Sequence, residues 1–161
     1  MGINVPVSRP ISWKAIPIIV SVWIAFMCLF GWIFPPDGIF IGMIVFGLLF
    51  FVLQRVVPKS HNRGMRSVHK KEFNAAIAHF RESDSFFSRY SWVDKYRALT
   101  ILSLSNLSYR EMALCNIAFC YSHTNEPKKA KELYEKILLE YPNNGIAYYS
   151  LNAINTFSEG Q

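Results

Sequence analysis

Two long runs without charged residues lie close together near the start of the chain, and they constrain its fold more than any other feature. The runs cover residues 15–34 and 39–53, and only residues 35–38 separate them. A helix of about 20 residues reaches about 30 Å, the thickness of the hydrocarbon core of a bilayer. Because Arg55 can extend its charge to the interface, the second run lengthens to 38–57. The sequence therefore predicts a two-helix transmembrane hairpin over residues 15–57.

Lysine and arginine are concentrated on one side of this predicted hairpin. Two precede the first span, six lie within residues 55–71, and the turn carries only Asp37. Basic flanks of membrane spans stay in the cytoplasm. We therefore expect both termini in the cytoplasm, with residues 1–14 as a cytoplasmic flank and residues 58–70 as a basic juxtamembrane linker. Two spans with short loops and a small cytoplasmic domain favour a prokaryotic inner (plasma) membrane.

The formal net charge of +6 comes from these flanks and not from the rest of the chain. Residues 72–161 hold nine lysines and arginines against ten acidic residues. A nucleic-acid surface needs its basic excess on the folded part, so we expect no nucleic-acid partner. The basic residues within 55–71 suit anionic lipid head groups instead.

Small residues in the second span predict close helix packing. Gly38 and Gly42 are four residues apart, and Gly47 follows. Such glycines let helices approach closely, either within the hairpin or between two copies in a homo-oligomer. The sequence favours packing within the hairpin. Neither span holds an ionisable residue before Arg55, which argues against a transport pathway.

Residues 71–161 predict a soluble all-α domain. Apolar residues recur at steps of three and four in 128–141 and in the stretch just upstream. Prolines bound the first of these stripes, at Pro127 and Pro142. Ser108 and Glu111 have the spacing of a capping box for the upstream helix. Two antiparallel helices joined by a short turn follow from this pattern.

The residue types at the helix crossing have a specific spacing. They are Leu114, Ile117, Ala118, Tyr121, Ala130, Tyr134 and Pro142. This series resembles the 34-residue helix-turn-helix of the tetratricopeptide repeat (TPR) family, and the resemblance covers residues 111–144. It implies that these seven residues pack the repeat, with the two alanines at the crossing. Ile137 departs from the pattern, where a small residue is usual.

Two partial copies flank this repeat. Residues 71–80 are similar to the second helix of a repeat, with Ala76 and Phe80 at the small and aromatic positions. The expected first helix of that copy falls on 57–70, which holds Pro58 and Gly64 and is interpreted as linker. Residues 146–157 resemble one more first helix, which would cap the end of a repeat stack.

The TPR resemblance also implies a binding surface. Domains of this family bind peptides or other proteins in a groove lined by their first helices. The positions that correspond to such a groove are Met112, Cys115, Asn116, Phe119, Tyr149 and Ser150. Some members clamp a partner's carboxylate with Lys, Arg and Asn, but only Asn116 matches here, so an apolar groove is expected. The alternative is that these residues pack against neighbouring helices.

Residues 88–107 separate the copies where the family has a short turn. A helix from Trp92 to about Leu104 is predicted here, which would bring the number of helices in residues 71–161 to about five. Apolar residues on two faces favour a core helix. The alternative is that Tyr90, Trp92 and Tyr96 meet the membrane interface or a partner.

The sequence offers no pattern typical of catalysis. Cys115 and Cys120 are five residues apart on a helix and diverge, and with Cys28 they are expected to be reduced, small buried residues. The four histidines are scattered, so we expect no metal, and no phosphate loop or nucleophile with a matched base suggests a cofactor or an enzyme. We expect a membrane-anchored cytoplasmic scaffold or adaptor that binds another protein. The alternative is a small structural subunit of a membrane complex, with the hairpin making the main contacts.

Overall fold

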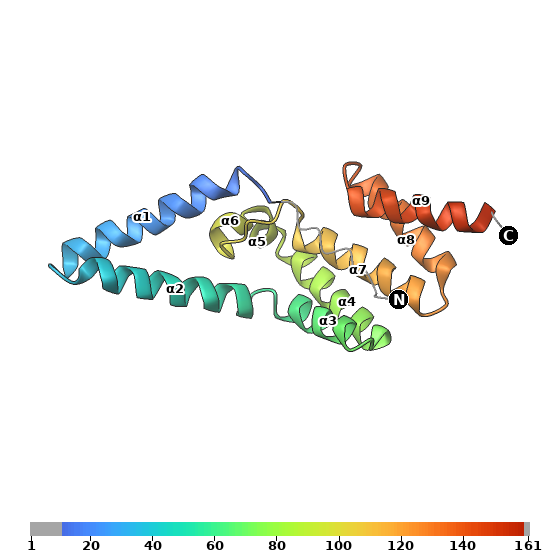
Figure 1. Ribbon diagram of the computed structural model, residues 1–161, viewed down its shortest axis with the longest axis horizontal. Coiled ribbons are helices and arrows are strands. Elements are labelled where there is room, and N and C mark those ends of the chain that lie inside the picture. The colour runs from blue at the N-terminus through green and yellow to red at the C-terminus, as the bar shows by residue number, and fades with distance from the viewer. Residues whose placement is uncertain (1–10, 160–161) are drawn as a thin grey trace. The chain divides into compact units, whose positions relative to one another are not determined.

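The computed structural model describes residues 11–159, with side chains through residue 156, and this part of the chain is all-helical (Figure 1). The helices are α1 (Ala15–Ile33), α2 (Gly38–Val56), α3 (Lys59–His69), α4 (Phe73–Arg89), α5 (Ser91–Lys95), α6 (Arg97–Thr100), α7 (Tyr109–His123), α8 (Pro127–Glu140) and α9 (Gly145–Glu159). They form two units. The hairpin unit comprises residues 11–58 and 90–108, and the stacked-helix unit comprises residues 59–89 and 109–159. Most of the predicted N-terminal flank lies outside the described residues.

The hairpin unit is built on α1 and α2, two antiparallel helices of 19 residues each that are long and apolar enough to cross a membrane. Gly38 and Gly42 are buried where the two helices meet. A Cβ at Gly38 would overlap the backbone of Phe30, and one at Gly42 would lie 3.1 Å from the Phe26 carbonyl oxygen. These two glycines therefore pack the hairpin itself, whereas a Cβ at Gly47 would have no neighbour within 4 Å.

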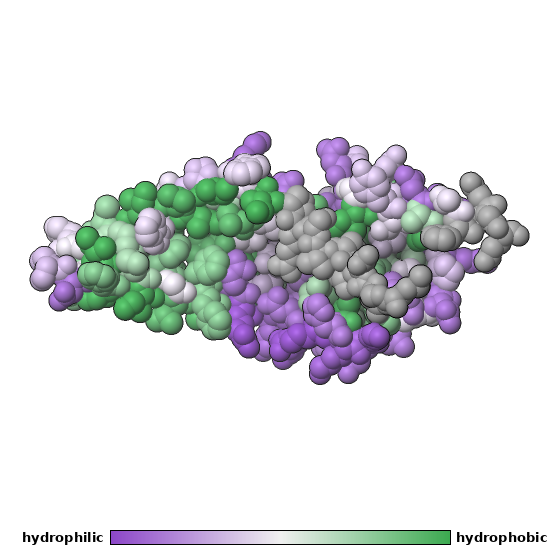
Figure 2. Space-filling view, viewed as in Figure 1, coloured by the Kyte–Doolittle hydropathy of each residue, from purple (hydrophilic) through white to green (hydrophobic). Residues whose placement is uncertain are grey.

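The outward faces of α1 and α2 are apolar and uncovered (Figure 2). On α2, Phe40, Ile44 and Leu48 are 70%, 64% and 61% exposed. Burial of such side chains is worth about 1.5–3 kcal/mol each, so water is an unfavourable surrounding for this surface. Both helices satisfy their own backbone hydrogen bonds, which is what a hydrocarbon surrounding requires.

The single helix predicted from Trp92 to Leu104 is wrong. The structure has two short helices, α5 and α6, followed by irregular chain from Ile101 onward. Six helices, not about five, therefore lie in residues 71–159 as described. Leu102 has a positive φ of 54° and is buried, and it marks where the helical path ends.

Contacts with the hairpin explain this break. Ser12 N–H donates to the Leu104 carbonyl at 2.8 Å, and Ile11 and Ser105 form an isolated antiparallel bridge. Gln54 Nε2 donates to the Leu102 carbonyl at 3.0 Å. Leu102, Leu104 and Ser105 thus bond through their backbones to α2 and to the residues just before α1, instead of continuing the helix. The segment lies at the open end of the hairpin (Figure 1).

The stacked-helix unit packs each helix against the next in the order α3, α4, α7, α8 and α9. The interpretation of residues 58–70 as linker is wrong for most of its length, because residues 59–69 form α3. His61, Gly64, Ser67 and Val68 are buried on its inner face. The imidazole of His61 lies edge-on to the rings of Phe80 and Tyr109, with centroids 5.4 Å apart in both cases.

The pairs α3–α4 and α7–α8 turn in the same way. Lys71 and Asn125 follow the first helix of each pair and have φ values of 63° and 57°. The next residue's N–H then reaches back five residues, from Glu72 to Ser67 at 2.9 Å and from Glu126 to Tyr121 at 3.1 Å. This is the Schellman ending of a helix, here built twice without glycine.

The helix crossings of the two pairs also correspond, at a constant offset of 54 residues. Gly64 corresponds to Ala118, Ala76 to Ala130 and Phe80 to Tyr134; Gly64, Ala118, Ala76, Ala130, Phe80 and Tyr134 are all buried. A Cβ at Gly64 would lie 2.6 Å from the Phe80 ring, so the missing side chain makes room for the larger partner. The unit thus contains two complete helix pairs and α9.

Candidate interaction cleft

The stacked-helix unit has an open cleft of about 390 Å³ between α4, α7 and α8. The cleft is lined by Arg81 and Asp84 of α4, Leu114, Ile117 and Tyr121 of α7, and Lys129, Glu132, Leu133 and Lys136 of α8. This volume falls within the usual range of ligand pockets, about 300–1,000 Å³. The sequence pattern did not predict this cleft, because two of its three walls, α4 and α8, are second helices of their pairs and only α7 is a first helix.

The floor of the cleft is apolar and its rim is charged. Leu114 and Ile117 are buried, and Leu133 is half-buried beside them. Arg81 donates from Nη2 to the Tyr121 hydroxyl at 2.5 Å, and the Lys129 ammonium lies 5.6 Å from the centroid of the same ring. Tyr121 therefore contacts two cationic side chains at one end of the cleft.

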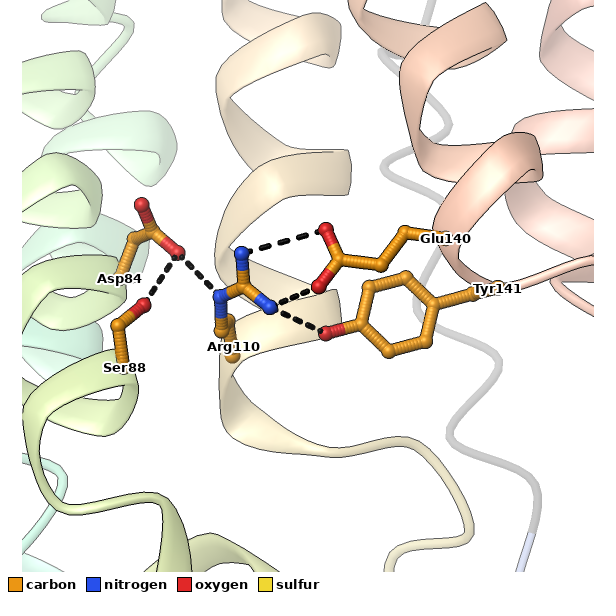
Figure 3. A network of polar contacts seen from close by, with 5 residues as sticks. All are labelled: Asp84, Ser88, Arg110, Glu140 and Tyr141. Carbon is orange, nitrogen blue, oxygen red and sulfur yellow. Dashed lines mark hydrogen bonds and ion pairs between the residues drawn. The ribbon is translucent and has the colours of Figure 1, made fainter.

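Arg110 organises the neighbouring polar network (Figure 3). Its Nε donates to Asp84 Oδ1 at 3.1 Å, and Asp84 is part of the cleft lining. The other side of the guanidinium pairs with Glu140 and donates to the Tyr141 hydroxyl at 3.1 Å. Ser88 Oγ donates to the same Asp84 oxygen at 3.4 Å.

This network joins α4 to the end of α8 through a residue in the first turn of α7. A planar guanidinium can pair with two carboxylates at once, which a lysine cannot do in the same geometry. Burial raises the pKa of Tyr141 above its ordinary value, and the charge of Arg110 acts in the opposite direction. The hydroxyl therefore remains a neutral acceptor for Arg110.

The predicted groove residues are placed differently from the expectation. Met112, Cys115 and Phe119 are buried, and none of them is among the residues that line the cleft. Asn116 Nδ2 donates to Met65 Sδ at 3.6 Å, and Ser150 shares a hydrogen bond with the Tyr134 hydroxyl. Tyr149 differs from the others, since 74% of it is exposed.

The physical reason is that the neighbouring helices fill the space. The Phe119 ring lies between Phe73 of α4 and His123, with centroids 6.4 Å and 4.2 Å away. Cys115 Sγ lies against the side-chain amide of Asn144 at 3.4 Å. The alternative that these residues pack against neighbouring helices is the one that the structure supports for Cys115 and Phe119.

Most of the residues predicted to pack the repeat are buried. Ala118, Ala130, Tyr134, Leu114 and Ile117 are buried and Tyr121 is half-buried, whereas Pro142 is exposed in the connection before α9. Ile137, which departs from the family pattern, is also fully buried in the same cluster. The structure therefore fills this position with a large side chain.

Asn144, which was not among the predicted site residues, joins α7 to α9. Its Oδ1 accepts the Ala147 N–H at 2.7 Å, which caps the start of α9, and its Nδ2 donates to Glu111 Oε1 at 2.8 Å. The signal available in the sequence was an asparagine two residues before the helix predicted over residues 146–157. Glu111, which was predicted as part of a capping box, is the acceptor for this amide.

The aromatics Tyr90, Trp92 and Tyr96 lie in the hairpin unit and are exposed. Val93, Ile101 and Leu102 of the same segment are buried. The segment thus contributes both to the core and to the surface.

Across residues 11–159, no three His, Cys, Asp or Glu side chains are grouped as metal ligands. Cys115 and Cys120 are buried, and burial raises the pKa of each thiol to about 12. An apolar floor with charges of both signs at its rim is suited to the side chains of a polypeptide. Comparisons of the chain with models of protein families, with curated proteins and with solved structures find no match.

Proposed function

We propose that this protein is a membrane-anchored adaptor, in which the hairpin unit spans a bilayer and the stacked-helix unit binds a partner protein in the cytoplasm. The observation that carries the proposal is the pairing of two uncovered apolar helices with a separate unit that has its own core and an open cleft. The basic residues on both flanks of the hairpin support a cytoplasmic position for the termini.

Two features support a TPR-like module as the partner-binding part. The two helix pairs have the same turn, and at each helix crossing small residues face a large aromatic ring, as a repeated unit requires. The cleft offers a partner Leu114, Ile117 and Leu133 at its floor, with Arg81 and Lys136 at its rim. Because Asp84 and Glu132 also line the cleft, a short segment with apolar side chains and charges of both signs has the complementary chemistry.

Site-specific photo-crosslinking in cells tests the adaptor function. A photoreactive residue is placed at Lys136 on the rim of the cleft, at its exposed neighbour Glu135 outside the cleft, and at Ile44 on the hairpin surface. The adaptor proposal expects one protein adduct from Lys136 and none from Glu135. An adduct from Ile44 alone would favour the alternative, a structural subunit whose hairpin makes the main contacts.

Thiol accessibility tests the topology separately. A cysteine replaces Asp37 in the turn or Ser150 in α9, in a chain whose Cys28 is serine. A membrane-impermeant maleimide applied to intact cells should label the turn and leave the α9 position unlabelled until the membrane is opened. The reverse pattern contradicts a cytoplasmic stacked-helix unit.

A further inference from the structure

The hairpin unit contains a small pocket at the beginning of α1. Its volume is about 130 Å³, and its lining comes from Ser12 and Lys14 before α1, Ala15 and Ile18 in α1, Lys95 in α5, Arg97 and Ala98 in α6, and Ser103 and Ser105 beyond it. This is roughly the space of four water molecules in the liquid, which is enough for a phosphate group. The lining comes from two segments that are joined by the hydrogen bonds of Leu102 to Gln54 and of Leu104 to Ser12.

The pocket has a single sign of charge. Lys14, Lys95 and Arg97 line it, and none of the described residues that line it is acidic. Arg97 is fixed in place, since it donates to the carbonyls of Asp94, Ser105 and Asn106 at 2.6–3.1 Å. The side chains of Lys14 and Lys95 are exposed and long enough to turn toward a ligand.

Hydroxyl groups add donors of the kind that a phosphate accepts. Ser12 and Ser103 belong to the lining, and Ser103 Oγ accepts the Ser105 N–H at 3.3 Å, a bond that does not use its own proton. Ala15 and Ile18 form the apolar side of the pocket on the first turn of α1. The polar part thus borders directly on the surface that we assign to lipid.

The position along the hairpin is that of a membrane interface. Residues 102–105 bond to Ile11 and Ser12, just before α1, and to Gln54 in the last turn of α2, which is the open end of the hairpin. Trp13, Trp92 and Tyr96 of the same unit are 81%, 59% and 51% exposed. Amphipathic aromatics gather at head-group level. The Lys95 ammonium lies 5.6 Å from the centroid of the Tyr96 ring.

We propose that this pocket binds the phosphate of an anionic phospholipid head group, with Lys14, Lys95 and Arg97 as the cationic groups. The proposal rests on the proposed membrane insertion of the hairpin. Basic pockets at the ends of membrane spans bind such head groups. The lipid would hold the pocket together across segments that are about 80 residues apart in the chain.

Quenching of tryptophan fluorescence by brominated lipids tests the proposal on the full-length protein. Trp23→Phe and Trp32→Phe leave Trp13 and Trp92, which lie in the hairpin unit near the pocket. The protein is reconstituted in equal mixtures of phosphatidylcholine and phosphatidylglycerol, in which one lipid or the other carries the bromine. Stronger quenching by brominated phosphatidylglycerol is expected, and equal quenching by the two lipids overturns the proposal.

Two double variants test whether the preference for phosphatidylglycerol comes from the pocket. Lys14→Gln with Lys95→Gln should lower the relative affinity for phosphatidylglycerol at least about fivefold, since each basic residue near a membrane surface contributes about that factor. Lys59→Gln with Lys70→Gln removes the same charge from exposed positions at the start of α3 and just after it, and should lower the preference less than the pocket variant does. Equal losses in the two variants would assign the effect to diffuse charge and overturn the site.

Three further experiments distinguish misfolding from loss of the site, a lipid ligand from free phosphate, and loss of membrane insertion from loss of the pocket. Lys14→Arg with Lys95→Arg should restore the preference, and failure to do so while the circular dichroism is unchanged contradicts a charge-based site. Inorganic phosphate at an ionic strength matched by chloride should leave the preference intact, and a loss with phosphate alone would assign the pocket to the free anion. Extraction of the protein from vesicles by alkali would refute the anchor itself, whereas retention without lipid preference refutes only this pocket.

Discussion

The side-chain amide of Gln54 donates a 3.0 Å hydrogen bond to the backbone carbonyl of Leu102, 48 residues further along the chain. Gln54 lies in the last turn of α2, and Leu102 has a positive φ at the point where α6 has ended. The bond therefore helps to fix a conformation that residues 101–105 would not adopt by themselves.

Gln54→Leu should loosen residues 101–105 without unfolding the hairpin. A buried carbonyl that loses its donor costs about 1–3 kcal/mol, so amide hydrogen exchange in this segment should be roughly tenfold faster or more. Exchange measured by mass spectrometry in detergent checks this. Arg55→Gln, one residue further along and exposed, is the control and should leave exchange unchanged. Unaltered exchange in Gln54→Leu would show that the bond contributes nothing.

Gly64→Ala should destabilise the stacked-helix unit. The new Cβ would lie 2.6 Å from the ring of Phe80, which is fully buried and cannot move away freely. Overpacking of this kind costs about 1–3 kcal/mol. Urea unfolding followed by circular dichroism measures the change. Gly145→Ala is the matched control, because its Cβ would make ordinary contact with Tyr149 at 3.9 Å. Equal stabilities of the two variants would mean that α3 does not pack on α4 as described.

The hairpin glycines make a parallel prediction. Gly42→Leu should separate α1 from α2, since even a Cβ there lies 3.1 Å from the Phe26 carbonyl oxygen, whereas Gly47→Leu meets open space. When samples in detergent are heated and then run on a size-exclusion column, the monomer peak should disappear at a lower temperature for Gly42→Leu only. Destabilisation by Gly47→Leu with loss of a dimer would point to packing between copies.

Substitution of Asn144 by aspartate should make the stability of the stacked-helix unit depend on pH. Asn144→Ala loses the cap of α9 and should cost about 1 kcal/mol at every pH. Asn144→Asp keeps the cap but replaces the donor to Glu111 with a buried carboxylate. Repulsion between the two carboxylates disfavours the ionised form in the folded state. The variant should therefore be closest to the native stability near pH 4 and lose stability as the pH rises. Parallel pH profiles for the two variants would contradict this geometry.

Alkaline unfolding should depend on the buried thiols. Burial raises the pKa of Cys115 and Cys120 from 9.0 to about 12, so the unfolded chain loses these protons first as the pH rises. Their contribution to stability is complete below pH 9 and disappears toward pH 12, at up to about 1.4 kcal/mol per pH unit for each group.

Urea unfolding at pH 8 to 11 checks the thiol prediction. Cys120→Ala should flatten the loss of stability above pH 9 by removing one of these ionisations. Cys28→Ala lies in α1 and serves as the control for the loss of a thiol elsewhere. A native-like slope in Cys120→Ala would show that this thiol is not shielded.

Local patterns predicted the elements whose signal is complete within one segment. The uninterrupted apolar runs determined α1 and α2, and the three- and four-residue stripe between Pro127 and Pro142 determined α8. The misreading of α3 came from the same local logic. Gly64 was interpreted as a helix breaker, whereas it is the small residue that faces Phe80, and its correspondence with Ala118 was the available signal.

Tertiary structure alone decided where distant side chains meet. Lys14 and Lys95 line one pocket, and Leu114 and Lys136 line one cleft, because helices pack through partners far apart in sequence. Backbone periodicity is a property of neighbouring residues, so the amino-acid sequence by itself determined an apolar pair of helices and the main helices that follow. The end of α6 and the burial of Cys115 and Phe119 depend on competing contacts across the fold, which no single stretch of the chain encodes.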